Sequence, residues 1–285
     1  MTVEQLKIAI VGAGGKMGMR VSDNLQRSTH DVCYVENSPA GQQRILEDGR
    51  TLTDADAAVR DAAVVILAVP DIALGPVSEQ LVPQVQPGTI VLTLDPAAAY
   101  ANLLYQRSDI EYAVAHPCHP SVFLQRRTEA ELNDTFGGIA APQDVVAALE
   151  SGDAEKQGIA ETVIRLMYAP VLDVHWVTVK QLAYLEPILV EVVACMIGDL
   201  LNDALQEIIH SVGVPEPAAR AMLMGHVQVA LANGLRGDNP FSDACLIAMD
   251  YGREKIIKEN WKSIFKDEEL DHVLKQMLHL DHIHH

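Results

Sequence analysis

Residues 7–18, with the sequence KIAIVGAGGKMG, decide how this chain folds. After Lys7 the run is apolar and rich in β-branched side chains, which predicts a strand buried on both faces, as in a parallel sheet. Glycines follow without a gap, and apolar residues at helical spacing come after Gly18. A strand, a glycine turn and a helix in this order begin a doubly wound α/β fold, and the N-terminus of such a helix attracts phosphate.

Glycine serves three purposes in a turn of this kind. It permits a tight turn, lets backbone N–H groups approach a pyrophosphate, and allows the helix to pack closely on the strand. Here Gly12, Gly14, Gly15 and Gly18 have a spacing one residue longer than the usual G-x-G-x-x-G. This spacing alone does not distinguish a dinucleotide-binding turn from a glycine-rich turn that binds no ligand, so a second feature of the sequence is needed.

A carboxylate at the end of the next predicted strand supports the binding of a dinucleotide. Residues 32–35 predict a second strand that ends at Glu36, about twenty residues beyond the glycines, where a carboxylate would accept hydrogen bonds from ribose hydroxyls. Because this carboxylate repels a 2′-phosphate, the sequence favours NAD as the cofactor over NADP. Two alternatives stay open: Arg44 would hold a phosphate if its loop folds back, and Glu36 would be a solvated residue at a strand end.

Length, charge and cysteine content narrow the class of protein. The 285 residues predict an NAD-binding Rossmann domain over 1–175 and a helical substrate-binding and dimerisation domain over 176–285. A formal net charge of −18 disfavours nucleic acid and anionic membranes as partners, so an anionic small-molecule substrate must meet a locally positive pocket. Neither a membrane-spanning apolar run nor a signal-peptide pattern is found, which predicts a cytoplasmic protein. Four cysteines without a CxxC pair argue against a zinc site or a disulfide framework.

Strand-like and helix-like segments alternate up to about residue 174. Strands are predicted at 61–69, 89–94, 112–115, 136–141 and 169–174, and helices at 57–60, 77–81, 144–149 and 154–167. This alternation predicts a Rossmann-type doubly wound parallel sheet, followed by an all-helical C-terminal domain. Val69 and Pro70 end one of the strands, so we expect them to line the cofactor crevice.

The hexapeptide HPCHPS at 116–121 follows a predicted strand and therefore lies at the same edge of the sheet. Its two prolines hold the backbone extended, so His116 and His119 are presented with little freedom, which suits acid–base chemistry or metal ligation. The alternative is that these histidines cap a loop. Cys118 is interpreted as a structural thiol rather than a nucleophile, because nothing in the sequence indicates a lowered pKa.

The chain turns helical from Thr178 onward. A long apolar helix is predicted over 178–209, with Glu186 among apolar neighbours as a candidate base or metal ligand; an exposed or paired carboxylate is the alternative. Since this helix is apolar over more than one face, it favours the core of a homodimer. A second helix over 216–233 carries His226, and the histidine-rich end at 278–285 is interpreted as a tail rather than a metal site.

The order of glycine turn, Glu36, VVILAVP strand, strand-end His-Pro and helical half resembles the 6-phosphogluconate-dehydrogenase-like superfamily of two-domain oxidoreductases. More narrowly, the chain looks like the D-apionate oxidoisomerase group. The motifs that carry this likeness are GAGGKMG at 12–18, AHPCHP at 115–120, FGGIAA at 136–141, LEP at 185–187 and GH at 225–226. The resemblance implies oxidation of a branched sugar acid by NAD, together with the movement of a substituent.

The resemblance also implies roles for residues of this chain. The residues that would bind NAD are Gly12, Gly14, Gly15, Lys16, Met17 and Glu36. Those that would face the substrate are His116, His119, Glu186 and His226, with Cys118 beside the two histidines. The sequence lacks the G-x-x-x-K-x-x-x-N signature of 6-phosphogluconate and β-hydroxyacid dehydrogenases, so the lysine-assisted proton transfer of those families is not implied.

Together these features predict an NAD-dependent oxidoreductase that acts on a CH–OH group of a small branched hydroxy acid. His116 or His119 would remove the hydroxyl proton, and Glu186 would orient the substrate or hold a divalent metal. Three alternatives stay open. They are a hydroxyacid dehydrogenase without rearrangement, a prephenate-type dehydrogenase, whose Met-Phe-Gly is missing here, and a non-catalytic NAD-binding sensor, which the rigid histidine loop disfavours.

Overall fold

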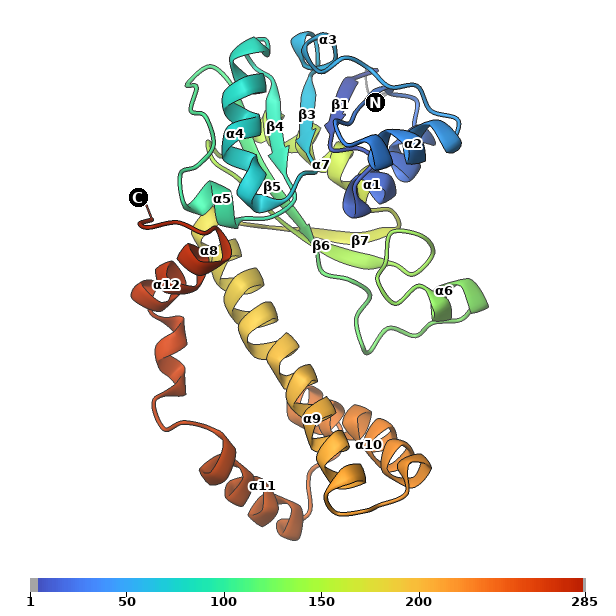
Figure 1. The fold of residues 1–285 in the computed structure, drawn as a ribbon, viewed down its shortest axis with the longest axis vertical. Coiled ribbons are helices and arrows are strands. Elements are labelled where there is room, and N and C mark those ends of the chain that lie inside the picture. Colours follow the sequence, from blue (N-terminus) through green and yellow to red (C-terminus); the bar gives the residue numbers. More distant parts are fainter. Residues whose placement is uncertain (1–4, 284–285) are drawn as a thin grey trace. The chain divides into compact units, whose positions relative to one another are not determined.

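The computed structural model describes residues 5–283 and contains a seven-stranded sheet in the order β2-β1-β3-β4-β5-β6-β7 (Figure 1). The strands are β1 (Lys7–Val11), β2 (Asp31–Val35), β3 (Val64–Leu67), β4 (Ile90–Thr93), β5 (Glu111–Pro117), β6 (Gln143–Leu149) and β7 (Val171–Val177). All neighbouring pairs are parallel except β5 with β6. Since β2 and β3 lie on opposite sides of β1, the strand order reverses between β1 and β3, and a doubly wound sheet opens its ligand crevice at that point.

Both faces of the sheet are covered by helices. The described part of the chain, including the segment that follows the sheet, contains the helices α1 (Lys16–Gln26), α2 (Pro39–Glu47), α3 (Ala55–Arg60), α4 (Asp71–Leu81), α5 (Ala97–Tyr100), α6 (Glu129–Asn133), α7 (Ala154–Met167), α8 (Val179–Ala183), α9 (Met196–His210), α10 (Glu216–Leu231), α11 (Asp243–Ile256) and α12 (Asp267–Met277). Ile8 and Ile10 of β1 join a core with α1, α2 and α7, whereas Ala9 and Val11 join a second core with α3 and α4. Side chains alternate between the faces of a strand, so a strand that is apolar throughout needs a helix layer on each side.

Most of the predicted elements are confirmed, including the strands at 61–69, 89–94, 112–115 and 169–174. The expected strand at 136–141 is wrong, because these residues form a loop, and the expected helix at 144–149 is wrong, because they belong to β6. The sequence DVVAAL carries no decisive periodicity, and pairing with β5 on one side and β7 on the other selects the strand. The sheet is therefore mainly parallel, with one antiparallel pair.

The carboxylate of Asp134 holds the 136–141 loop in its shape. Its two oxygens accept hydrogen bonds from the backbone N–H groups of Gly137, Ile139, Ala140 and Ala141, at 2.8–3.1 Å. Gly137 has a φ of +81°, and a Cβ there would lie 2.5 Å from the side-chain oxygen of Gln143. Because the N–H groups are bound to a side chain and the backbone turns through the left-handed region, this segment cannot join the sheet.

Replacing Asp134 by alanine is expected to lower the free energy of unfolding by about 2–4 kcal/mol, since four N–H groups lose their acceptor. Burial raises the pKa of Asp134, but the N–H donors outweigh it and lower the pKa overall. The stabilisation is therefore present above the unfolded-state pKa and is lost as the pH falls through the lower folded-state pKa. Urea unfolding at neutral and acid pH measures the free energy of unfolding of both proteins. The difference in this free energy between the variant and the wild type should become smaller in acid. Exposed Glu129, replaced by alanine, is the control, and an equal loss there would contradict the assignment.

The chain divides into two compact units. One contains the residues up to Glu186 and those from Asp271 onward, and the other is Pro187–Leu270. The hydroxyl of Tyr100 in α5 donates a hydrogen bond to the carboxylate of Asp271 at 3.1 Å, which attaches the C-terminal segment to the first unit. The domain boundary after residue 175 stays a prediction. Of the predicted histidine-rich tail, residues 284–285 lie outside the described part of the chain.

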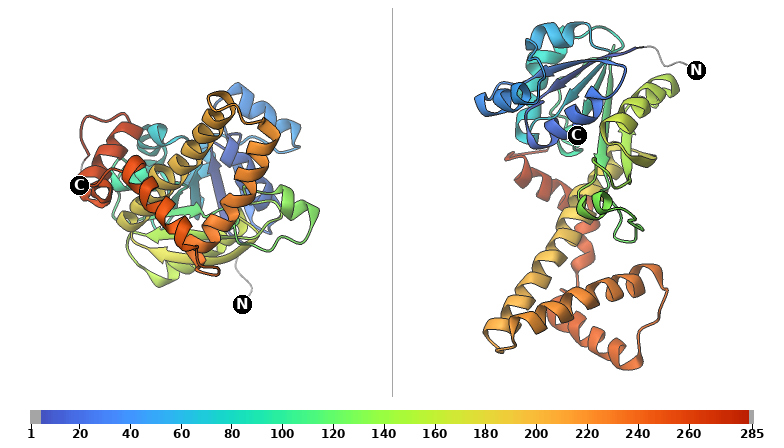
Figure 2. Two further views of the ribbon diagram at one scale, coloured as in Figure 1. Left: turned by 90° about the horizontal axis from the view of Figure 1, so that it is seen from below. Right: turned by 90° about the vertical axis from the view of Figure 1, so that its right-hand side faces the viewer.

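The unit Pro187–Leu270 is helical. The helix predicted over 178–209 is confirmed as α8, a π-helical segment (Tyr184–Cys195) and α9, and the helix predicted over 216–233 as α10 and its extension. In this unit α9 and α10 pack beside each other and α11 follows (Figure 2). None of the helices between residues 5 and 283 is both long and apolar enough to cross a membrane.

Candidate active site

The glycine turn is closely packed where it leaves β1. Gly12 has a φ of +81°, and a Cβ there would lie 2.5 Å from the carbonyl oxygen of Ala68 after β3. A Cβ on Gly18 would collide with the Gly12 carbonyl, and one on Gly14 with the backbone of Gly41 in α2. Helix α1 then begins at Lys16, with Gly15 as an N-cap that makes no side-chain hydrogen bond. The glycines thus bring β1, β3 and α2 together round an uncrowded helix N-terminus, which suits a pyrophosphate.

Glu36 and Arg44 both hold this turn. The carboxylate of Glu36, directly after β2, accepts a hydrogen bond from the Gly14 N–H at 2.9 Å and others from the N–H groups of Asn37 and Ser38. The Nε of Arg44 donates to the Gly14 carbonyl at 2.8 Å. Arg44 thus lies on α2 rather than on a loop, and its side chain contacts the glycine turn from that helix.

Two hollows flank the turn along the carboxyl edge of the sheet. The residues round the first include Val11, Gly12, Val35, Glu36, Asn37 and Val69. Those round the second include Gly15, Lys16, Met17, Val69, Pro70, Leu94 and Asp95. The hollows meet at Val69, beside the switch point of the sheet, and every predicted cofactor residue either borders a hollow or belongs to the turn. These residues fit an extended dinucleotide.

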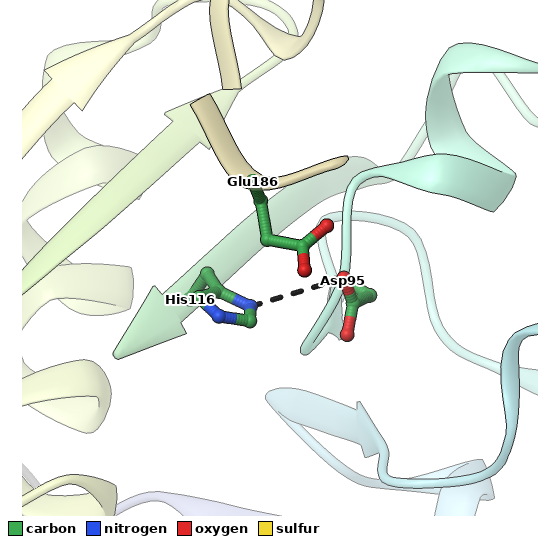
Figure 3. A group of neighbouring side chains, drawn as sticks. All are labelled: Asp95, His116 and Glu186. Carbon is green, nitrogen blue, oxygen red and sulfur yellow. Dashed lines mark ion pairs between the residues drawn. The ribbon is translucent and has the colours of Figure 1, made fainter. Parts of the chain in front are cut away.

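Three titratable side chains converge next to the second hollow. Asp95 follows β4, His116 is carried by β5, and Glu186 lies just beyond α8 (Figure 3). The Nδ1 atom of His116 lies 3.8 Å from a carboxylate oxygen of Asp95, and one ligand atom from each residue lies within 4.8 Å of the other two. Glu186 is buried, whereas Asp95 and His116 are half-buried. Two carboxylates and an imidazole at this separation can hold a divalent cation or handle a proton.

The surroundings of His116 keep its imidazole neutral. Burial lowers the pKa of His116 and outweighs the Asp95 carboxylate and the Leu94 carbonyl, which raise it; neighbouring His119 lowers it further. The Nδ1 atom lies 3.2 Å from the Leu94 carbonyl. In the tautomer that donates from Nδ1 to this carbonyl, the Nε2 atom carries the lone pair and can accept a proton.

His119 and Cys118 differ in what they can contribute. His119 adopts a φ of +60°, its Nδ1 lies 2.8 Å from the Phe136 carbonyl, and its ring centroid is 6.3 Å from that of His116. The two histidines are thus held near each other by backbone carbonyls from different segments. Partial burial and the carboxylate of Asp144 raise the pKa of the Cys118 thiol, which disfavours a thiolate nucleophile.

Family models match both halves of the chain. Residues 1–104 match a Rossmann-like domain, and residues 124–278 match the C-terminal domain of phosphogluconate dehydrogenase (decarboxylating). A D-apionate oxidoisomerase from Pectobacterium atrosepticum is 58% identical over 99% of this chain and 99% of its own length. The chain belongs to the D-apionate oxidoisomerase family. Another member, from Cupriavidus necator, is 39% identical over 95% of this chain and 99% of its own length.

A solved structure supports the same family and fold. The crystal structure of a semialdehyde dehydrogenase NAD-binding protein from Cupriavidus necator, in complex with calcium and NAD, has a TM-score of 0.93 and 38% sequence identity, and the match covers 96% of this chain and 99% of that one. The predictions of the superfamily, the D-apionate oxidoisomerase group and the NAD-binding oxidoreductase fold are therefore confirmed.

Three residues of the predicted site lie in one compact unit of this oxidoisomerase family member. His116, His119 and Glu186 belong to the first compact unit, whereas His226 lies on α10 in the second, exposed, with its Nδ1 2.8 Å from the Met222 carbonyl. The role of His226 toward substrate stays a prediction. Sequence reasoning missed Asp95, although its position directly after a predicted strand, before a proline, was a usable signal.

Proposed function

We propose that this chain is an NAD-dependent oxidoreductase that oxidises a CH–OH group of D-apionate, or of a closely related branched sugar acid, and moves a substituent in the same reaction. One observation carries the proposal: Asp95 borders the second hollow beside the glycine turn and also lies 3.8 Å from His116. A substrate held at His116 would therefore adjoin a dinucleotide that lies along the turn. The identity to D-apionate oxidoisomerases supports the choice of substrate.

Each residue of the cluster has a chemical role in this proposal. His116 accepts the proton of the reacting hydroxyl at Nε2, and the Leu94 carbonyl orients its ring through Nδ1. The Asp95 carboxylate stabilises the resulting imidazolium electrostatically, and Glu186 orients the substrate. NAD, when bound, supplies the two-electron oxidant. A divalent cation would be held by Asp95, Glu186 and His116, and would polarise the developing carbonyl; His119 is then the base. Glu36 at the end of β2 favours NAD over NADP.

The test is NADH formation, followed at about 340 nm, with a panel of sugar acids that includes D-apionate. NAD and NADP are compared, and the product is analysed by NMR. A rearranged carbon skeleton with NAD as the preferred cofactor would support the proposal. An oxidised but unrearranged product would replace it with a plain dehydrogenase, and NAD binding without turnover of any acid would favour a sensor.

We also propose that the functional unit is a homodimer built on Pro187–Leu270. Within this unit the buried apolar residues are Ile188, Leu205, Ala219 and Leu270. The exposed ones include Leu189, Met196, Leu200, Met222, Met224, Val229, Ile247 and Tyr251. An exposed apolar surface of this extent is typical of an obligate interface. A second copy of the same chain is the partner that is always present to bury it.

The dimer predicts a mass of twice 31.0 kDa in light scattering after gel filtration. Replacing exposed Ile247 and Met222 by aspartate is expected to shift the protein toward the monomer, because two buried carboxylates would lack partners in the interface. The matched control is Leu132→Asp, an exposed apolar residue of the first unit. A monomeric wild type at micromolar concentration would contradict the prediction.

A further inference from the structure

Cationic side chains gather round the ring of Phe136, beside the glycine turn. The guanidinium carbon of Arg20 lies 4.2 Å from the ring centroid, and the Nζ of Lys16 lies 5.4 Å from it. The ring of His119 packs against the same phenyl ring at a tilt of 47°, with a centroid separation of 4.3 Å. The three side chains come from α1 and from the histidine loop, and all belong to the first compact unit.

The loop that carries Phe136 also holds two of these groups through its backbone. The Nη1 of Arg20 donates to the Gly137 carbonyl at 2.6 Å, and the Nδ1 of His119 lies 2.8 Å from the Phe136 carbonyl. Asp134 binds four N–H groups of the same loop and thereby makes it rigid. Arg20 and His119 are therefore built into one place rather than left to move in solvent.

These cations are not neutralised by the protein. Within residues 5–283, neither Lys16 nor Arg20 forms an ion pair with a carboxylate, although the chain carries a net charge of −18. Lys16 occupies the first position of α1, whose first turn has no acidic residue, so its charge adds to the positive end of the helix dipole. The region is a local source of positive potential on an acidic protein and attracts an anion.

The position of this cluster suits a substrate rather than the protein's own stability. Lys16 borders the same hollow as Asp95, and the ring of His119 lies 6.3 Å from the ring of His116. An acid whose carboxylate lies at the cationic side chains would extend its carbon chain toward His116.

We propose that Lys16 and Arg20, which lie against Phe136 beside His119, bind the carboxylate of the substrate and select hydroxycarboxylates over neutral polyols. This inference rests on the proposed function, because it takes His116 as the place of the reacting hydroxyl. It adds a specificity site to that function. The alternative is that Lys16 and Arg20 bind the pyrophosphate of NAD instead of the substrate.

Charge-removing variants separate these assignments. In Arg20→Met, the dissociation constant of D-apionate from the enzyme–NADH complex should rise about 10- to 100-fold in calorimetry, while the dissociation constant of NADH stays unchanged. Lys16 also borders the hollow that fits the dinucleotide, so Lys16→Met is expected to weaken the binding of both ligands. Arg20→Lys should recover part of the affinity, because it restores the charge. The matched control is Arg27→Met at the exposed C-terminal end of the same helix, which should change neither constant.

A neutral ligand tests the role of charge directly. The wild type should prefer D-apionate to its uncharged amide, and both variants should lose this preference. In Arg20→Met, weaker NADH binding with unchanged acid binding would assign Arg20 to the pyrophosphate and overturn the inference, as would unchanged binding of both ligands. If the wild type turns over no sugar acid, the proposed function fails; glycolate and tartronate binding to the NADH complex then tests the carboxylate site, and no binding of either acid overturns it.

Discussion

Replacing His116 by alanine is expected to lower kcat by about 10²- to 10⁴-fold and to leave the affinity for NAD unchanged. His116 lies at the end of β5, beside Asp95, and its pKa is lowered by burial, so its imidazole is neutral at neutral pH and can serve as a base or as a metal ligand. The glycine turn and Glu36 hold the cofactor hollows without any contribution from its ring. Steady-state kinetics with D-apionate measure kcat, and calorimetry with NADH measures binding.

The control for this variant is His175→Ala. His175 lies on β7 and is exposed, so the same change of side chain there should leave both quantities unaltered. If the His116 variant keeps the wild-type kcat, His116 is neither base nor ligand, and the proposed site is wrong. If it loses NADH affinity as strongly as turnover, the residue supports the cofactor rather than the substrate.

Replacing Glu186 by glutamine, or removing divalent cations with a chelator, is expected to lower turnover by a similar order, roughly 10²-fold or more. Glu186 is buried, and its carboxylate lies with Asp95 and His116 in a set of atoms no more than 4.8 Å apart. Glutamine keeps the size of the side chain but removes the charge that attracts a cation. Turnover is measured after chelation and again after titration with magnesium.

Magnesium should restore the chelated wild type fully, and it should restore the Glu186 variant only at a higher concentration, if at all. Glu155→Gln, at an exposed position in the first turn of α7, is the control and should behave as the wild type. Full turnover of the wild type in excess chelator would exclude the cation. His116 would then act as the base, as in the metal-free form of the proposed site.

Local patterns account for the parts of the fold that could be predicted. The apolar run before Gly12, the VVILAVP strand and the long helix after Thr178 each have a hydrophobic pattern that favours the structure they adopt. Residues 136–149 have no pattern of this kind. The loop at 136–141 depends on the Asp134 carboxylate, and β6 depends on its pairing with β5 and β7, so neither could be inferred from short-range hydrophobicity.

The same division applies to the candidate site. The sequence by itself determined the glycine turn, the carboxylate after β2 and the two rigid histidines, because glycine, proline and strand-end positions act over a few residues. Only the tertiary structure decided that Asp95 meets His116 and Glu186, and that Lys16 and Arg20 meet Phe136. The proximity of Asp95 and His116 depends on the order of strands in the sheet, which places the carboxyl ends of β4 and β5 side by side. Tertiary packing brings in the other groups from distant segments of the chain.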